Sequence, residues 1–274
     1  MHVLPLVIST LAALAIAPSL LMFLSDNQHV RQNYRGALLP IPLGLLIPAA
    51  ALVALIPLAL IDGLLDEPRA LDVAGLFLVL GVAVLGLADD TLAGASRGWR
   101  GHGAAVLKGG FNTGVLKAAG TLGLALAWSA GTQQGNARFL LAAAVIVLAT
   151  NVFNLLDLRP GRSIKAFVLL GAALTIGALD TDPLLQVGLW AGPIMIAGIY
   201  DVRERGMLGD TGSNVVGVVA GLWLVLVLNT TGLAIALAAL VLITVYGELR
   251  SISALVERTP GLRHLDSLGR PHRA

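Results

Sequence analysis

Residues 139–157 read FLLAAAVIVLATNVFNLLD, an apolar run that ends in Asn151, Asn154 and Asp157. A helix needs about 20 mostly apolar residues to cross a bilayer core about 30 Å thick, and this stretch meets that requirement. Steps of three residues keep Asn154 and Asp157 within about 60° of each other around the helix. The stretch therefore predicts a transmembrane helix that ends in a polar group at one membrane surface.

The composition of the whole chain also indicates a membrane protein. Of its 274 residues, 57% are hydrophobic and 12% are charged, whereas soluble domains are about 45–50% apolar and about 25% charged. The 32 glycines suit helices that approach closely through small residues. The chain has no cysteine, which excludes disulfides, thiolate nucleophiles and cysteine-bound metals. A net charge of +2 gives no reason to expect nucleic acid as a partner.

Similar apolar runs recur along the chain and predict an all-α, polytopic transmembrane bundle of about nine helices. The predicted ranges are 3–24, 39–61, 71–88, 113–130, 139–156, 165–180, 184–200, 214–229 and 232–249. The first run has no basic segment before it and is too long for a signal peptide, so we interpret it as a helix.

The basic residues predict the orientation, because short cytosolic loops are enriched in Lys and Arg. If the N-terminus is outside, 16 of the 18 basic residues are cytosolic, and only Arg69 and Arg138 are outside. We therefore expect the plasma membrane as the location, with the C-terminus in the cytosol. Residues 1–249 form the predicted transmembrane domain. Residues 250–274 form a basic tail, which we expect to lie on anionic lipid headgroups.

Two polar motifs end predicted helices on the cytosolic side. Asp89 and Asp90 end the third helix, where adjacent carboxylates are either a solvated helix end or a site for a divalent metal or a general base. The motif from Asn151 through Asn154 to Asp157 ends the fifth helix. Its amides have an alternative role in hydrogen bonding between helices.

A third motif, GDTGSN at residues 209–214, opens the eighth predicted helix. Its glycines permit tight turns, and Thr211 and Ser213 are candidate N-caps. A helix N-terminus of this kind can hold an anion, and Asp210 can hold a Mg²⁺ ion that binds phosphate. Lys108 and Lys117 lie in a glycine-rich stretch after Asp90 and suit a diphosphate.

In the order, spacing and membrane side of these three motifs, residues 30–230 resemble the polyprenyl-phosphate N-acetylhexosamine-1-phosphate transferases, which include phospho-N-acetylmuramoyl-pentapeptide transferase. The resemblance implies that a polyprenyl phosphate attacks the β-phosphate of a UDP-sugar with Mg²⁺, releasing UMP in cell-envelope glycan synthesis. It implies that Asp89 or Asp90 deprotonates or positions the lipid phosphate and that Asp210, with Asp90, holds the metal. Asn154 and Asp157 would shape the nucleotide site, with Lys108 or Lys117 at the diphosphate and Thr211 and Ser213 at the substrate. The expected partners are the lipid phosphate, the UDP-sugar and the surrounding bilayer. Whether the protein forms a homodimer is left open by the sequence.

The chain departs from that family after Asp157, where Arg159 stands near the position of a second family aspartate. Two roles stay open for Arg159. Its guanidinium either contacts the phosphate of the sugar nucleotide or anchors the loop at the headgroups, the role expected for Arg162 and Lys165. The alternatives for the whole chain are a non-catalytic relative that binds lipid phosphate or envelope-assembly partners, and a membrane transporter.

Overall fold

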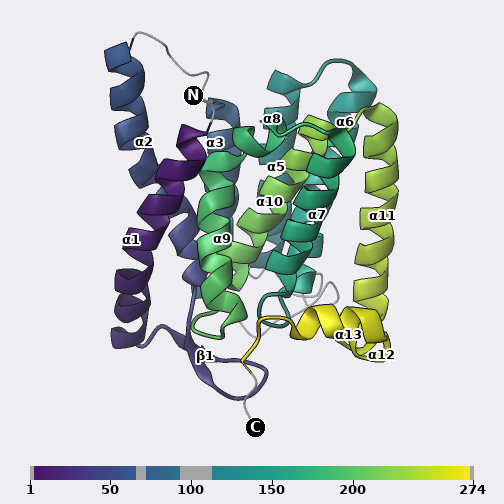
Figure 1. Cartoon of the computed structure of the whole chain (residues 1–274). Helices are drawn as coiled ribbons and strands as arrows, with labels where there is room; N and C mark the ends of the chain where they lie inside the picture. Colours follow the sequence, from purple (N-terminus) through teal and green to yellow (C-terminus); the bar gives the residue numbers. More distant parts are fainter. Residues whose placement is uncertain (1–2, 66–71, 93–112, 272–274) are drawn as a thin grey trace.

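The computed structural model describes residues 3–65, 72–92 and 113–271, and it is a bundle of α-helices (Figure 1). The long helices are α1 (Leu4–Asp26), α2 (Leu46–Leu65), α3 (Val73–Leu92), α5 (Thr113–Thr132), α6 (Asn136–Leu156), α7 (Arg162–Ala178), α9 (Gly188–Val202), α10 (Gly209–Val227) and α11 (Thr230–Leu249). Three shorter helices are α8 (Asp182–Gln186), α12 (Ile252–Arg258) and α13 (Pro260–Ser267). Each predicted apolar range overlaps one of the long helices, and the all-α bundle is confirmed.

Six helical segments in the described part of the chain are long and apolar enough to cross a membrane. They are Leu4–Asp26, Leu43–Leu64, Val73–Leu92, Asn136–Leu156, Gly209–Val227 and Thr230–Leu249. Helix α5 has the length but not the hydropathy, while α7 and α9 have 17 and 15 residues. The apolar segments support a membrane protein.

The second predicted helix begins later than the sequence indicated. Residues 39–45 contain the end of strand β2 (Leu38–Pro40) and a 3-10 turn, η1 (Leu43–Leu45), instead of the first turns of a helix. Pro40 and Pro42 explain the difference, because the residue before a proline is disfavoured in the α-helical conformation. Strand β2 pairs antiparallel with β1 (Val30–Gln32), so a small hairpin joins α1 to α2.

Helix α10 is the centre of the bundle, and 83% of its most apolar window is buried inside the protein. Two glycines of α10 bring it against α6: a Cβ at Gly217 would lie 2.5 Å from Cα of Thr150, and one at Gly221 would lie 2.8 Å from Cα of Ile146. Small residues therefore set this helix–helix distance, as the glycine content indicated.

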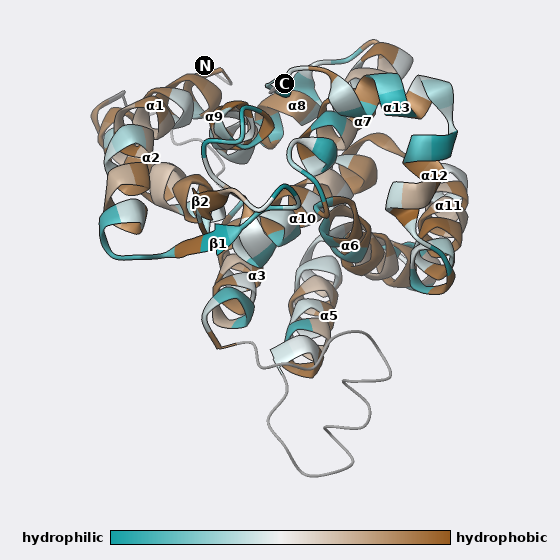
Figure 2. Cartoon of the chain, turned by 90° about the horizontal axis from the view of Figure 1, so that it is seen from below, coloured by the Kyte–Doolittle hydropathy of each residue, from teal (hydrophilic) through white to brown (hydrophobic). Residues whose placement is uncertain are grey.

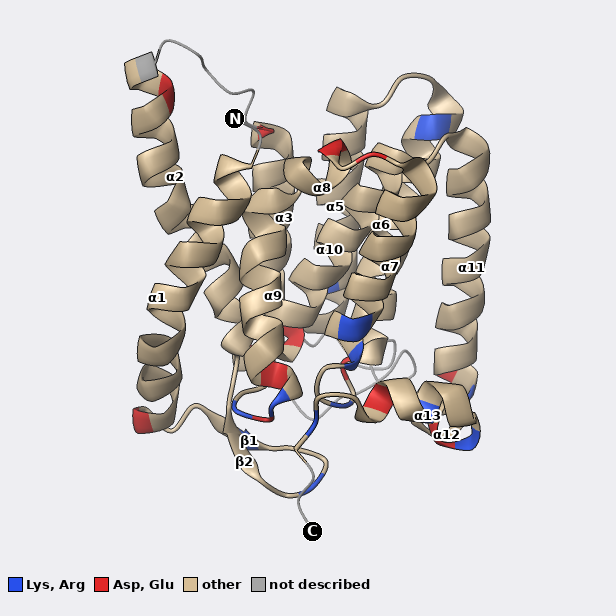
Figure 3. Cartoon of the chain, in the orientation of Figure 1, with Lys and Arg blue, Asp and Glu red and all other residues tan. Residues whose placement is uncertain are grey.

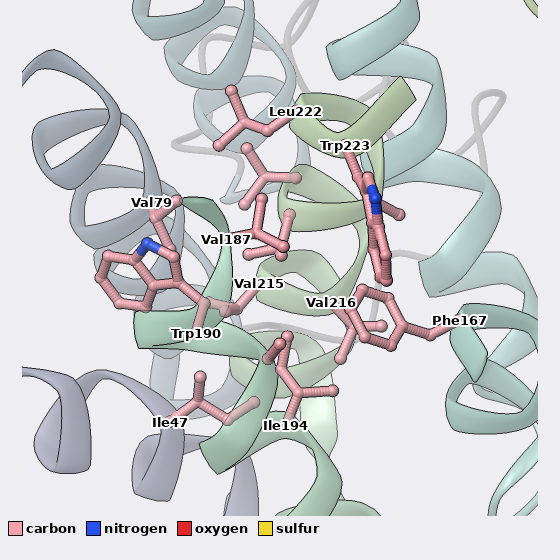
Figure 4. Close-up of a cluster of buried hydrophobic side chains, with 14 of the residues drawn as sticks. Ile47, Val79, Phe167, Val187, Trp190, Ile194, Val215, Val216, Leu222 and Trp223 are labelled. Atoms are coloured by element: carbon pink, nitrogen blue, oxygen red, sulfur yellow. The ribbon is translucent and has the colours of Figure 1, made fainter. Parts of the chain in front are cut away.

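Bulky side chains fill the other sides of α10. In Figure 4, Val215 and Val216 lie between Trp190 of α9 and Phe167 of α7, and Trp223 lies farther along α10. The Phe167 and Trp223 rings have centroids 5.6 Å apart and are tilted by 58°, a geometry that aromatic pairs favour. This packing fixes the position of α10, and therefore of the GDTGSN motif at its start.

Charged residues are concentrated at one end of the bundle. Most acidic and basic residues lie at the end that carries the hairpin, α12 and α13 (Figure 3). Seen from that end, hydrophilic residues gather in the connections and in the tail helices, while the long helices are mostly hydrophobic (Figure 2). Helix α1 begins at the opposite end of the bundle (Figure 1). We call the charged end the polar end below.

Candidate functional site

The predicted motifs meet at the polar end because α3 and α6 end there and α10 begins there. Lys117, in the second turn of α5, joins them. Its Nζ atom lies 3.0 Å from Oδ2 of Asp89 and 2.5 Å from Oδ2 of Asp210. The side chains of Lys117 and Asp89 are only 19% and 15% exposed. Two carboxylates from helices distant in sequence therefore converge on one cation position.

Asp90 has different contacts from its neighbour Asp89. Its Oδ1 atom accepts a hydrogen bond from the backbone N–H of Asp210 (2.9 Å), and Oδ2 accepts from the N–H and the hydroxyl of Thr211 (2.8 and 2.7 Å). Asp90 thus satisfies N–H groups in the first turn of α10, as a capping side chain does. The expectation that Thr211 or Ser213 caps this helix is wrong, because α10 begins at Gly209 and both residues lie inside it. Their hydroxyls donate instead to Asp90 and Asn154.

Close backbone contacts hold the start of α10 in register with Asp90. A Cβ at Gly86 of α3 would lie 2.6 Å from the carbonyl oxygen of Asp210. A Cβ at Gly44 of η1 would lie 2.1 Å from Cα of Gly212. Any larger residue at either position would push α10 away. The glycines of α3 and η1 therefore position Asp210 as directly as its own motif does.

The α6 motif lies beside the same helix start. Oδ1 of Asn154 accepts a hydrogen bond from the Ser213 hydroxyl at 3.0 Å. Asp157 follows the last turn of α6 as its C-cap. Burial raises the pKa of the Asp157 carboxyl well above its usual range, and the nearby carboxylates of Asp201 and Asp210 raise it further. A raised pKa makes a carboxyl group easier to protonate, so it can exchange a proton with a ligand.

Asp201 belongs to the same cluster of carboxyl groups as Asp157 and Asp210, and the sequence did not single it out. It lies near the end of α9, is 2% exposed, and its Oδ2 accepts the backbone N–H of Gly161 at 2.6 Å. Gly161 has φ +75°, which disfavours other residues, and a Cβ there would meet Val202. A carboxylate that ends a helix beside basic loops was the signal that selected Asp89, and the same signal was available for Asp201.

Arg159 and Arg162 have opposite environments. Arg159 forms an ion pair with the exposed Glu257 of α12, and its guanidinium carbon lies 5.0 Å from the centre of the Tyr34 ring. Arg162 is 6% exposed and donates two hydrogen bonds to Asp266, at 3.0 and 3.2 Å. The expectation that Arg162 only anchors the loop at headgroups is wrong, because its guanidinium is buried and paired inside the protein.

The Arg162 contact belongs to a network that attaches the tail to the bundle. Arg270 also donates two hydrogen bonds to Asp266, at 2.7 and 3.1 Å, and a third to the carbonyl oxygen of Pro160. Burial alone would raise the pKa of the Asp266 carboxyl, but the two guanidiniums hold it below its usual value. The tail is therefore bound to the protein through buried charges and does not lie only on the membrane surface.

The donor groups at Lys117 fit the expected Mg²⁺ ion. Asp89 and Asp210 converge on a position that a cation already occupies. Mg²⁺ binds through one or two carboxylates and completes its shell with water and substrate phosphate. Among the described residues, no group of three or more His, Asp or Glu side chains is gathered closely enough for a metal ion. Lys108, the other predicted diphosphate ligand, lies outside the described residues.

Comparison with known proteins does not extend this description: no family model matches the chain, and no curated protein matches it. The candidate site is therefore defined by its own geometry.

Proposed function

We propose that this protein transfers a sugar-1-phosphate from a UDP-sugar to a polyprenyl phosphate and releases UMP, with Mg²⁺ as cofactor, in cell-envelope glycan synthesis. The observation that carries the proposal is the convergence of Asp89 and Asp210 on Lys117 beside the start of α10. Carboxylates, an ammonium and a helix N-terminus together supply what phosphoryl transfer requires, namely positioning and neutralised charge.

The described residues divide the work as follows. An oxygen of the lipid phosphate attacks the β-phosphorus of the UDP-sugar, and the bond between that phosphorus and the oxygen of the UMP α-phosphate breaks. Asp89 accepts a proton from the lipid phosphate or positions it. Lys117 neutralises charge on the diphosphate, to which its ammonium is free to turn once a metal holds the two carboxylates. Asp210 would hold Mg²⁺ together with Asp89 in place of the expected Asp90, because both oxygens of Asp90 are engaged at the start of α10. The ion would supply charge neutralisation when bound.

The remaining residues position these groups. Asp90 fixes the first turn of α10 and therefore Asp210. Asn154, held by Ser213, and Asp157 are proposed to shape the nucleotide site. Arg159 is proposed to reach the nucleotide phosphate by exchanging its partner Glu257 for that anion, because guanidinium groups bind carboxylate and phosphate in the same way.

The proposal includes a topology. All nine long helices are taken to cross the plasma membrane, with the N-terminus outside and the polar end in the cytosol, where UDP-sugars are made. Helices α7 and α9, the two shortest of the nine, pack beside α10 and begin or end at buried ion pairs and hydrogen bonds. Their polar-end residues satisfy one another instead of facing lipid, which is how intramembrane charges are tolerated.

A second candidate is a non-catalytic protein that binds lipid phosphate. It is favoured by the fact that Asp90 is fully engaged by three hydrogen bonds and that Lys117 neutralises the other carboxylates without any metal. A protein that only binds a lipid phosphate needs Lys117 to turn from its carboxylate partners to that anion, but it needs no metal.

The test is UMP release by the purified protein with polyprenyl phosphate, Mg²⁺ and a panel of UDP-sugars. Activity with one sugar, lost on chelation, supports the transferase. The matched variants are Asp210→Asn, which should be inactive, and Asp26→Asn, which alters an exposed carboxylate at the end of α1 and should be fully active. If no UDP-sugar gives UMP while polyprenyl phosphate still binds, the non-catalytic candidate replaces the proposal.

A further inference from the structure

An apolar groove of about 490 Å³ lies at the polar end between α7, α11 and the tail helices. Helices α12 and α13 cross below the ends of α7 and α11 (Figure 1). Leu169 and Leu242 face the groove from α7 and α11 and are 54% and 70% exposed, while Leu262 and Leu265 face it from α13. In the proposed topology these leucines face the bilayer, so the groove suits an acyl chain of a lipid.

The same groove has a cationic margin. Arg162, Lys165 and Asp266 line it together with the apolar side chains. Both oxygens of Asp266 are taken by Arg162 and Arg270. Lys165 donates to the backbone carbonyl of Asp266 at 2.7 Å, and within the described residues no carboxylate forms an ion pair with it. Three cations therefore surround Asp266, and the buried Asp201 is the only other carboxyl group near Lys165 among the described residues. The cluster keeps a net positive charge, and Lys165 is the cation in it that forms no ion pair.

We propose that this groove binds an anionic phospholipid of the surrounding bilayer, with its phosphate at Lys165 and an acyl chain along the leucines of α7, α11 and α13. The ligand follows from the two features together: the leucine surface fits a hydrocarbon chain, and the surplus cation at its edge fits a phosphate. A neutral headgroup would leave the charge of Lys165 unbalanced.

The groove is separate from the candidate reaction site, because Lys117, Asp89 and Asp210 belong to α5, α3 and α10. None of these three residues lines the groove. The inference therefore goes beyond the proposed transferase and does not depend on it. The lipid would hold the tail helices against the bundle through Leu262 and Leu265.

The test is native mass spectrometry of the delipidated protein, titrated with phosphatidylglycerol, phosphatidylcholine of the same acyl chains, and polyprenyl phosphate. Phosphatidylglycerol should bind about fivefold more tightly than phosphatidylcholine, the usual effect of one lysine at an anionic headgroup. Lys165→Gln should remove that difference. Arg263→Gln removes an equal charge from an exposed position of α13 outside the groove and should keep it.

A second variant tests the apolar part. Leu242→Trp fills the groove from α11 and should weaken both phospholipids, while tryptophan fluorescence and gel filtration check that the protein is folded. Equal binding of the two phospholipids to the unsubstituted protein would overturn the proposal, as would unchanged selectivity in Lys165→Gln. Tighter binding of polyprenyl phosphate that is lost in Lys165→Gln would also overturn it, because the occupant would then be the carrier lipid.

Discussion

Replacing Asp90 by alanine should destabilise the protein by about 2–4 kcal/mol, because its carboxylate caps the first turn of α10. The side chain accepts hydrogen bonds of 2.9, 2.8 and 2.7 Å from two backbone N–H groups and the Thr211 hydroxyl. Loss of a capping side chain costs about 1 kcal/mol, and a hydrogen bond to a charged group contributes about 1.5–3 kcal/mol. The estimate lies below the sum because water at the polar end can replace part of these contacts.

Thr211→Val isolates one of the three contacts. The threonine is fully buried, and valine has nearly its shape, so the change removes the hydroxyl donor and should cost about 1 kcal/mol. In the double variant the two costs should not add, because the hydroxyl has no partner once Asp90 is alanine. The expected coupling is about 1 kcal/mol. Asp26→Ala, at an exposed carboxylate that ends α1, is the control and should change stability by less than about 0.5 kcal/mol.

The measurement is equilibrium unfolding in mixed micelles titrated with dodecyl sulfate. Tryptophan fluorescence is a suitable signal, since Trp128, Trp190 and Trp223 are at most 5% exposed. If Asp90→Ala is as stable as the Asp26 control, then Asp90 does not cap α10. If its cost adds fully to that of Thr211→Val, the hydrogen bond from the Thr211 hydroxyl contributes nothing to the cap. In the first case, the carboxylate oxygens of Asp90 would be available to a metal ion, which is the role that the family resemblance implies.

Three further predictions test the topology, the metal site and the tail. A cysteine at Arg205 should be shielded from an impermeant thiol reagent in intact cells, while one at Gln134 should react; the reverse pattern would invert the proposed orientation. Asp210→Asn should abolish UMP release while the unfolding midpoint stays close to that of the unsubstituted protein, because asparagine still accepts the hydrogen bond from Lys117; retained turnover would exclude Asp210 as the essential metal ligand. Arg162→Gln should destabilise by about 1.5–3 kcal/mol, because it removes hydrogen bonds to the buried Asp266 carboxylate while Arg270 remains as the partner of that group, whereas Arg159→Gln, whose partner is exposed, should cost about 0–1 kcal/mol; equal costs in dodecyl sulfate unfolding would contradict these environments.

The sequence was sufficient for the helices and for the end of the bundle at which the polar motifs gather. Apolar runs long enough for a bilayer can satisfy their backbone groups only as helices, so residues such as 139–156 had one available structure. The glycines of α10 likewise indicated close packing. The exceptions were local: Pro40 and Pro42 delayed α2, and α10 began at Gly209, five residues before the predicted range.

Only the tertiary structure decided which partner each polar residue has. Asp89 and Asp90 are adjacent in the chain, yet one pairs with Lys117 and the other caps α10, because neighbouring residues on a helix point about 100° apart. Arg159 and Arg162 are three residues apart, but only Arg162 points to the buried carboxylate of Asp266, which lies 104 residues later. A sequence places a residue at the end of a helix. The rotation of that helix and the neighbours packed against it determine whether its charge pairs with another side chain, caps a helix or binds a ligand.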